Sequence, residues 1–182
     1  MIDHDRRDRR INARDVMVQA VSLPAGDPSV LTSDICRDGL AYWRRLGSAG
    51  GLPDRAAVDP ADMRGLLPYT YMVDGLPGGL DFRYRLVGTN IVAHTPRDNT
   101  GRLLSELETQ GTQKQLRALF ASAVAGGCPR FQRIAYRAST GLRSWYETVV
   151  CPMRDRTGGP EAMMLIGWAE HFHQPIDDPE AG

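Results

Sequence analysis

The sequence predicts an α+β domain in which helices cover one face of a five-stranded antiparallel sheet, with a helical extension at its N-terminal side. Three observations support this fold class. Two β-type segments are followed by a helical stretch and then by three further β-type segments. Apolar and basic residues alternate along 82–86, as in a strand with one buried face. Connections rich in glycine separate the predicted strands.

The helical extension is predicted over residues 29–46. Its apolar residues recur close to helical spacing, and the sequence GGLP at 50–53 ends the pattern. These apolar residues are Leu31, Ile35, Leu40, Trp43 and Leu46. A shorter helix is expected over 59–67, because Asp59 can cap it and Pro60 suits its first position.

The remaining elements follow in chain order. The first two strands are predicted at 69–74 and 80–87, joined by the turn-rich sequence GLPGG. Helices are expected at 90–94, 103–107 and 112–125. The last three strands are predicted at 131–137, 144–153 and 162–169.

The chain is expected to divide into four parts. A flexible, arginine-rich N-terminal arm covers residues 1–28, and the amphipathic helix with its stop covers 29–51. The sheet and its helices occupy 52–173. A disordered tail rich in proline and aspartate covers 174–182.

Composition argues against several kinds of partner. The chain has 22 basic and 22 acidic residues, so no net field attracts nucleic acid or an acidic membrane. No apolar run approaches the roughly 20 residues that span a bilayer, and the N-terminus lacks the apolar stretch of a secretory signal. Cys36, Cys128 and Cys151 form no CxxC pair, so neither a disulfide framework nor a zinc site is expected. We therefore expect a cytoplasmic protein that needs no metal.

Several ordered segments carry a more specific likeness. They are AYWRRL, LPDRAAVDPADMRGLLPYTYMVD, FRYRLVGTNIV and NTGRLLSEL. Together they resemble the PAS_5 family, a group of alphaproteobacterial PAS-like domain proteins, over residues 40–170. The resemblance implies a PAS-like fold for the α+β domain. It also implies a bacterial sensor or docking module that signals through flanking helices or a partner.

A ligand-binding role would place a cavity between the sheet and its helices. The positions expected to line it are Phe82, Tyr84, Val92, His94, Tyr136, Trp145 and Met164. The alternative is that these side chains simply fill the core. Four charged residues are expected on the opposite face, paired across strands, and a register error of one residue would exchange the two sets. They are Arg83, Arg85, Arg133 and Glu147.

Cofactor and catalytic chemistry have little support in the sequence. His94 could ligate haem iron from the helical stretch over the sheet, although a lone histidine is more often capped or exposed. The asparagine-cysteine-arginine-phenylalanine motif of flavin photosensors is absent. No nucleophile–base pair, phosphate-binding GxxxxGK[ST] loop or HExxH zinc motif occurs, so no enzymatic activity is expected.

The function expected from these observations is that of a stand-alone PAS-like signalling domain that acts through a protein partner, a small ligand or both. We expect a homodimer, and the predicted contacts to a second copy or another partner are Leu40, Trp43 and Leu46. The first alternative is a redox or gas sensor that holds haem at His94 or another cofactor. A purely structural scaffold domain is the second.

Overall fold

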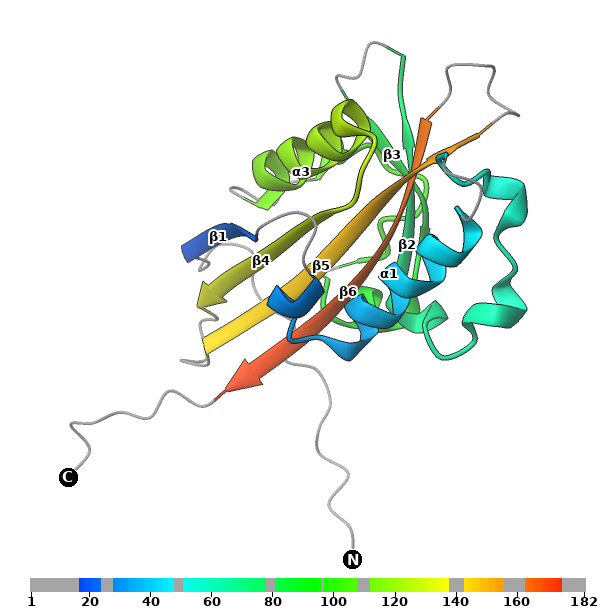
Figure 1. Cartoon of the computed structure of the whole chain (residues 1–182). Coiled ribbons are helices and arrows are strands. Elements are labelled where there is room, and N and C mark those ends of the chain that lie inside the picture. The colour runs from blue at the N-terminus through cyan, green and yellow to red at the C-terminus, as the bar shows by residue number, and fades with distance from the viewer. Residues whose placement is uncertain are drawn as a thin grey trace, which may run out of the picture.

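The protein is built around one six-stranded antiparallel sheet in the order β1-β4-β5-β6-β2-β3 (Figure 1). The structure is a computed structural model that describes residues 17–23, 28–47, 51–77, 81–95, 97–107, 112–137, 143–155 and 163–174. The strands are β1 (Met17–Leu23), β2 (Thr70–Gly75), β3 (Phe82–Val87), β4 (Arg130–Arg137), β5 (Arg143–Arg154) and β6 (Met163–Gln174). The α-helices are α1 (Asp34–Leu46), α2 (Thr89–Ala93) and α3 (Thr112–Gly126).

The predicted α+β fold is confirmed, and each of the five predicted strands is present as β2 to β6. The helices between β3 and β4 pack on one face of the sheet, as expected, because Phe120 of α3 and Leu104 share one apolar cluster with that face. The described residues also include five short 3-10 segments: η1 (Pro28–Val30), η2 (Arg55–Ala57), η3 (Pro60–Met63), η4 (Leu67–Tyr69) and η5 (Leu104–Glu106).

Two details differ from the sequence analysis. Residues 17–23, expected to belong to a flexible arm over 1–28, form β1 and pair with β4 along their whole length. The sequence MVQAVSL is mostly apolar and contains two β-branched valines, which suits a strand. The arginine run that precedes it made the whole segment 1–28 resemble a flexible arm. The helix expected over 59–67 is instead η3 followed by η4, with Pro60 and Pro68 in their first turns. Residues 1–16 and 175–182 lie outside the described residues.

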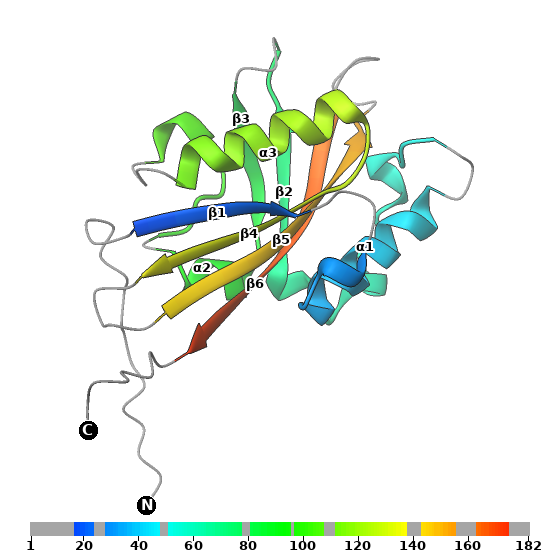
Figure 2. The ribbon, with the colours of Figure 1, turned by 60° about the vertical axis from the view of Figure 1, so that its left-hand side comes forward.

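The sheet is covered on both faces (Figure 2). Val149 and Ile166 pack with α1, whereas their neighbours Val150 and Leu165 pack with α3. Successive side chains of a strand point to opposite faces, so β5 and β6 supply two cores at once. In the described part of the chain, no helix is long and apolar enough to cross a membrane.

Helix α1 begins and docks through local features of its sequence. Ser33 is the N-cap, and its hydroxyl accepts a hydrogen bond from the backbone N–H of Cys36 at 3.0 Å. Gly39 lets the helix approach β6 closely, because a Cβ atom there would lie 2.2 Å from the ring of Trp168. The helix is therefore an integral layer of the domain.

Candidate functional site

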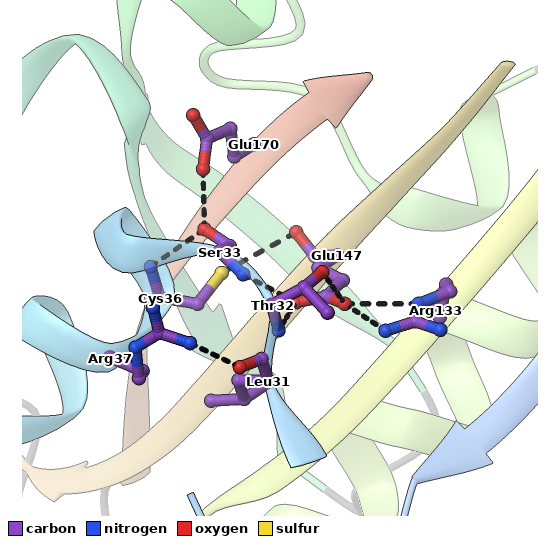
Figure 3. Close-up of polar contacts among 8 residues, drawn as sticks. All are labelled: Leu31, Thr32, Ser33, Cys36, Arg37, Arg133, Glu147 and Glu170. Atoms are coloured by element: carbon purple, nitrogen blue, oxygen red, sulfur yellow. Dashed lines mark hydrogen bonds and ion pairs between the residues drawn. The ribbon is translucent and has the colours of Figure 1, made fainter. Parts of the chain in front are cut away.

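Two glutamates lie side by side on the face of the sheet that α1 covers. Glu147 of β5 is the register partner of Glu170 of β6. Like charges that face each other directly across an antiparallel ladder repel each other. Figure 3 shows that both carboxylates meet the segment that leads into α1. The start of this helix therefore faces a pair of acids.

Glu147 is the centre of the contact between the sheet and the start of α1, which we call the junction of α1. Its side chain is fully buried. One carboxylate oxygen accepts hydrogen bonds from the backbone N–H groups of Thr32 and Ser33, at 2.8 and 3.0 Å. The other accepts from the Thr32 hydroxyl at 2.6 Å and from the guanidinium of Arg133 on β4, whose Nε lies 3.0 Å away. Arg133 and Glu147, two of the four charged residues expected to pair across strands, are register partners and form an ion pair.

The ionisation of Glu147 follows from these bonds. Burial alone would raise the pKa of its carboxyl group, because a charge in the protein interior loses its hydration. Hydrogen bonds from Thr32, Ser33 and Arg133 stabilise the carboxylate more strongly, and they hold the pKa below its ordinary value. Glu147 is therefore an anion at neutral pH, attached to the start of α1.

Ser33 connects the helix to the second acid. Its hydroxyl donates a hydrogen bond of 2.6 Å to Glu170 while it accepts one from the N–H of Cys36. Ser33 is 1% exposed, so this bridge is screened from water. The first turn of α1 is thus attached to β5 through Glu147 and to β6 through Glu170.

The nearby cysteines are unsuited to nucleophilic chemistry. The Cys36 thiol lies 3.5 Å from the carbonyl oxygens of Glu147 and Trp168, and burial raises its pKa to about 12. Burial also raises the pKa of Cys151 well above its ordinary value. Both thiols stay protonated at neutral pH, and a protonated thiol is a poor nucleophile.

The opposite face of the sheet carries a cluster of aromatic rings beneath α3. The ring of Phe120 lies 5.4 Å from that of Phe82, 5.9 Å from that of Tyr71 and 6.4 Å from that of Tyr84. All four side chains are buried. These contacts support the interpretation that Phe82 and Tyr84 fill the core.

The seven positions predicted to line a ligand cavity do not lie on one face. Phe82 and Tyr84 face α3, and Val92 and His94 lie in and just after α2. The His94 ring stacks on that of His171, with centroids 4.3 Å apart. Of the predicted set, Phe82, Tyr84, Val92 and His94 therefore lie near α2 and α3.

Met164 and Trp145 lie on the other face, which corrects their predicted placement. Met164 packs in the cluster beneath α1. Trp145 lies two residues before Glu147 in β5 and therefore shares its face, where its ring stacks on that of Phe172. Tyr136 belongs to β4, but its side chain lies outside the described residues.

The predicted partner contacts on α1 also need correction, because the apolar side of this helix faces its own sheet. Leu40 is 1% exposed and lies in the core. Trp43 donates a hydrogen bond of 2.9 Å from its indole nitrogen to the carbonyl of Pro152. Leu46 packs against the same cluster. These residues attach the helix to its own domain.

The outer side of α1 borders an open groove of about 380 Å³. It is lined by Ile35, Asp38, Ala41, Tyr42, Arg45, Asp62, Gly65 and Leu66. Sequence reasoning did not identify this groove, because its two walls are separated along the chain. No group of three or more potential metal ligands occurs in the described ranges.

The chain matches a known protein family. A family model described as PAS domain, PAS_5, matches residues 32–167, which is most of the chain. The match begins at Thr32, the first residue that donates a hydrogen bond to Glu147, so it includes α1 and its attachment to the sheet. No curated protein matches the sequence.

Proposed function

Because the chain belongs to the PAS_5 family of PAS domains, which are sensory and signalling modules, we propose that it signals by binding a protein partner and has no catalytic activity of its own. The observation that carries this proposal is the attachment of α1 to the sheet through Glu147. The high pKa values of the buried thiols Cys36 and Cys151 support the absence of nucleophilic catalysis.

The attachment of α1 rests on the hydrogen bonds that Thr32 and Ser33 donate to Glu147. The ion pair of Glu147 with Arg133 joins neighbouring strands of the sheet and stays in place when the helix moves away. Helix α1 is docked when Glu147 accepts the bonds from Thr32 and Ser33, and it is displaced when water replaces them. A partner that prefers one of these states shifts the population by its difference in affinity for them.

The groove on the outer side of α1 is the proposed contact surface. It combines apolar Ile35 and Leu66 with two carboxylates, Asp38 and Asp62, against one guanidinium, Arg45. This excess of acid fits a partner segment that presents a lysine or arginine beside apolar side chains. The groove lies on the same helix that Glu147 holds, so partner binding there and docking of α1 are coupled.

Site-specific photo-crosslinking in the source organism tests this proposal. A crosslinking amino acid at Asp38, which is exposed in the groove, is compared with one at Arg83, which is exposed on β3. We expect a discrete heterologous protein to be crosslinked from position 38 and not from 83, and the substitution Asp62→Arg to reduce its yield. Identical products from both positions, or none from position 38, would overturn the proposal.

Cofactor sensing at His94 is the alternative function. The Nδ1–H of His94 donates a hydrogen bond of 2.8 Å to the carbonyl oxygen of Asn90, so Nε2 is the nitrogen that would have to hold a haem iron. A visible absorption spectrum, recorded after expression with a haem supply, tests it. A haem band that His94→Ala removes would favour the alternative. A colourless protein with the mass of the bare chain in native mass spectrometry would exclude it.

A further inference from the structure

The two edges of the sheet are protected very differently. At the β3 edge, the backbone of a following segment covers the strand: Tyr84 N–H donates to the carbonyl of Arg102 at 2.9 Å, and Gly101 N–H donates to the carbonyl of Tyr84 at 2.7 Å. The backbone of Arg83 also forms an isolated antiparallel β-bridge with that of Leu103. At the other edge, β1 pairs with β4 alone within the residues that the structure describes.

The sequence of β1 contains none of the usual protection of an open edge. Its seven residues, MVQAVSL, include no charged residue and no proline, whereas β3 carries Arg83 and Arg85. Natural sheets discourage association of their edges with charges, prolines and bulges. The pairing of β1 with β4 runs over all seven residues without a register shift, whereas the pairing of β2 with β3 is interrupted by one. Strand β1 is therefore a regular, uncharged template for another strand.

We propose that the β1 edges of two copies of this chain pair antiparallel about a two-fold axis and join the two sheets into one. An antiparallel edge is self-complementary under a two-fold rotation, so a second copy supplies the matching pattern of N–H and C=O groups. The chain has zero net charge, so no overall repulsion opposes the association of two copies. Figure 2 shows β1 as the outermost strand beside β4.

This interface differs from the predicted dimer contact through Leu40, Trp43 and Leu46, which hold α1 on its own sheet. It is also independent of the proposed function, because a partner bound at the groove of α1 does not need the β1 edge. The crosslinking result at Asp38 and the oligomeric state of the chain can therefore succeed or fail separately.

Light scattering after size-exclusion chromatography of the full chain is the first test. We expect a mass of twice the 20.1 kDa of one chain. Full overlap of two β1 strands places Ala20, the central residue, opposite itself. Ala20→Lys therefore brings two like charges together and should weaken the dimer at least tenfold. The control Leu86→Lys on β3, where Leu86 is 37% exposed, should leave the dimer intact.

A second measurement does not depend on the stability of the lysine variant. Single cysteines at positions 19, 20 and 21 are placed in a Cys128→Ser background, in which the remaining Cys36 and Cys151 are buried. Residues opposite each other in an antiparallel pair are close enough for a disulfide. At least one of these cysteines should give a disulfide-linked dimer on mild oxidation, and Leu86→Cys should give none. A monomeric wild type, or a dimer insensitive to Ala20→Lys and crosslinked by no β1 cysteine, overturns the proposal.

Discussion

The two faces of the sheet are held to their helices by different interactions. Beneath α3, aromatic rings contact one another around Phe120, and the contacts are apolar. Beneath α1, an apolar cluster ends at a buried carboxylate that binds the first residues of the helix. Apolar packing is spread over many atoms, whereas the junction of α1 depends on the ionisation and hydrogen bonds of Glu147. Only the second kind of attachment includes an ionisable group, so its strength depends on pH.

The largest effect is expected from the apolar face. Phe120→Ala removes the ring that touches Tyr71, Phe82 and Tyr84, and it should lower the free energy of unfolding by about 3–5 kcal/mol. Urea denaturation measures this loss. Phe120→Leu keeps most of the volume and should cost much less. If both variants lost equally little, the cluster would not be the core that its contacts indicate.

At the junction of α1, Glu147→Gln should cost about 2–3 kcal/mol, because the neutral amide turns one acceptor into a donor that faces other donors. Hydrogen exchange should become faster in α1 while the amides of α3 stay protected. The control is Asp34→Asn, since the Asp34 side chain is 84% exposed and its ion pair with Arg37 is expected to contribute below about 0.5 kcal/mol. Equal acceleration of exchange in α1 and α3 would contradict the separation of the two faces.

The close approach of α1 to β6 gives the third prediction. Gly39→Ala places a Cβ atom within 2.2 Å of the Trp168 ring, so the helix must shift. The overpacking outweighs the better helix propensity of alanine, and a net loss of about 1–2 kcal/mol is expected in urea denaturation. Gly65→Ala, where no atom lies within 4 Å of the added Cβ, is the matched control and should be nearly neutral. A stabilised Gly39→Ala variant would mean that α1 is not packed this closely.

A single hydroxyl allows a finer comparison. Ser33→Ala removes the N-cap of α1 and its bond to Glu170, and it should cost about 1 kcal/mol. The same substitution on the other face, Ser122→Ala in α3, removes only a bond to the Leu119 carbonyl within the helix and should change stability by less than about 0.5 kcal/mol. Thermal unfolding of the two variants measures the difference. Equal effects would remove any special role for the start of α1.

The sequence contained enough information for most of the fold and for part of the site. Strand β3 alternates in the printed sequence, and its buried Phe82 and Tyr84 face α3 as expected. The order of elements and the resemblance to PAS_5 identified the family. Strand β6 begins MMLIGWA, which is apolar at every position, so no period distinguished the face of Met164.

The sequence indicated only part of the contact between Glu147 and its neighbours. Arg133 and Glu147 were both expected to pair across strands, although their pairing with each other, which follows from the register of β4 and β5, was not specified. The bonds of Glu147 to Thr32 and Ser33 join residues more than one hundred positions apart, and no local pattern indicates them. Helix α1 was expected to offer an apolar side to a partner. That side packs instead on β5 and β6, because a single helix buries its apolar stripe on the nearest open sheet face.

Lowering the pH is the mildest way to weaken the attachment of α1. Protonation of Glu147 removes its charge and leaves all of its heavy atoms in place. Its pKa in the folded protein lies below the ordinary glutamate value of 4.5, despite burial, because Thr32, Ser33 and Arg133 stabilise the anion. The stability that Glu147 contributes is therefore complete above about pH 4.5 and is lost as the pH falls through the folded pKa. Urea denaturation of wild type and Glu147→Gln at a series of pH values isolates this contribution, because other titrating groups are common to both proteins. The difference in unfolding free energy should shrink toward acid pH. A difference that stays constant down to pH 3 would show that Glu147 holds α1 by shape and hydrogen bonding rather than by its charge.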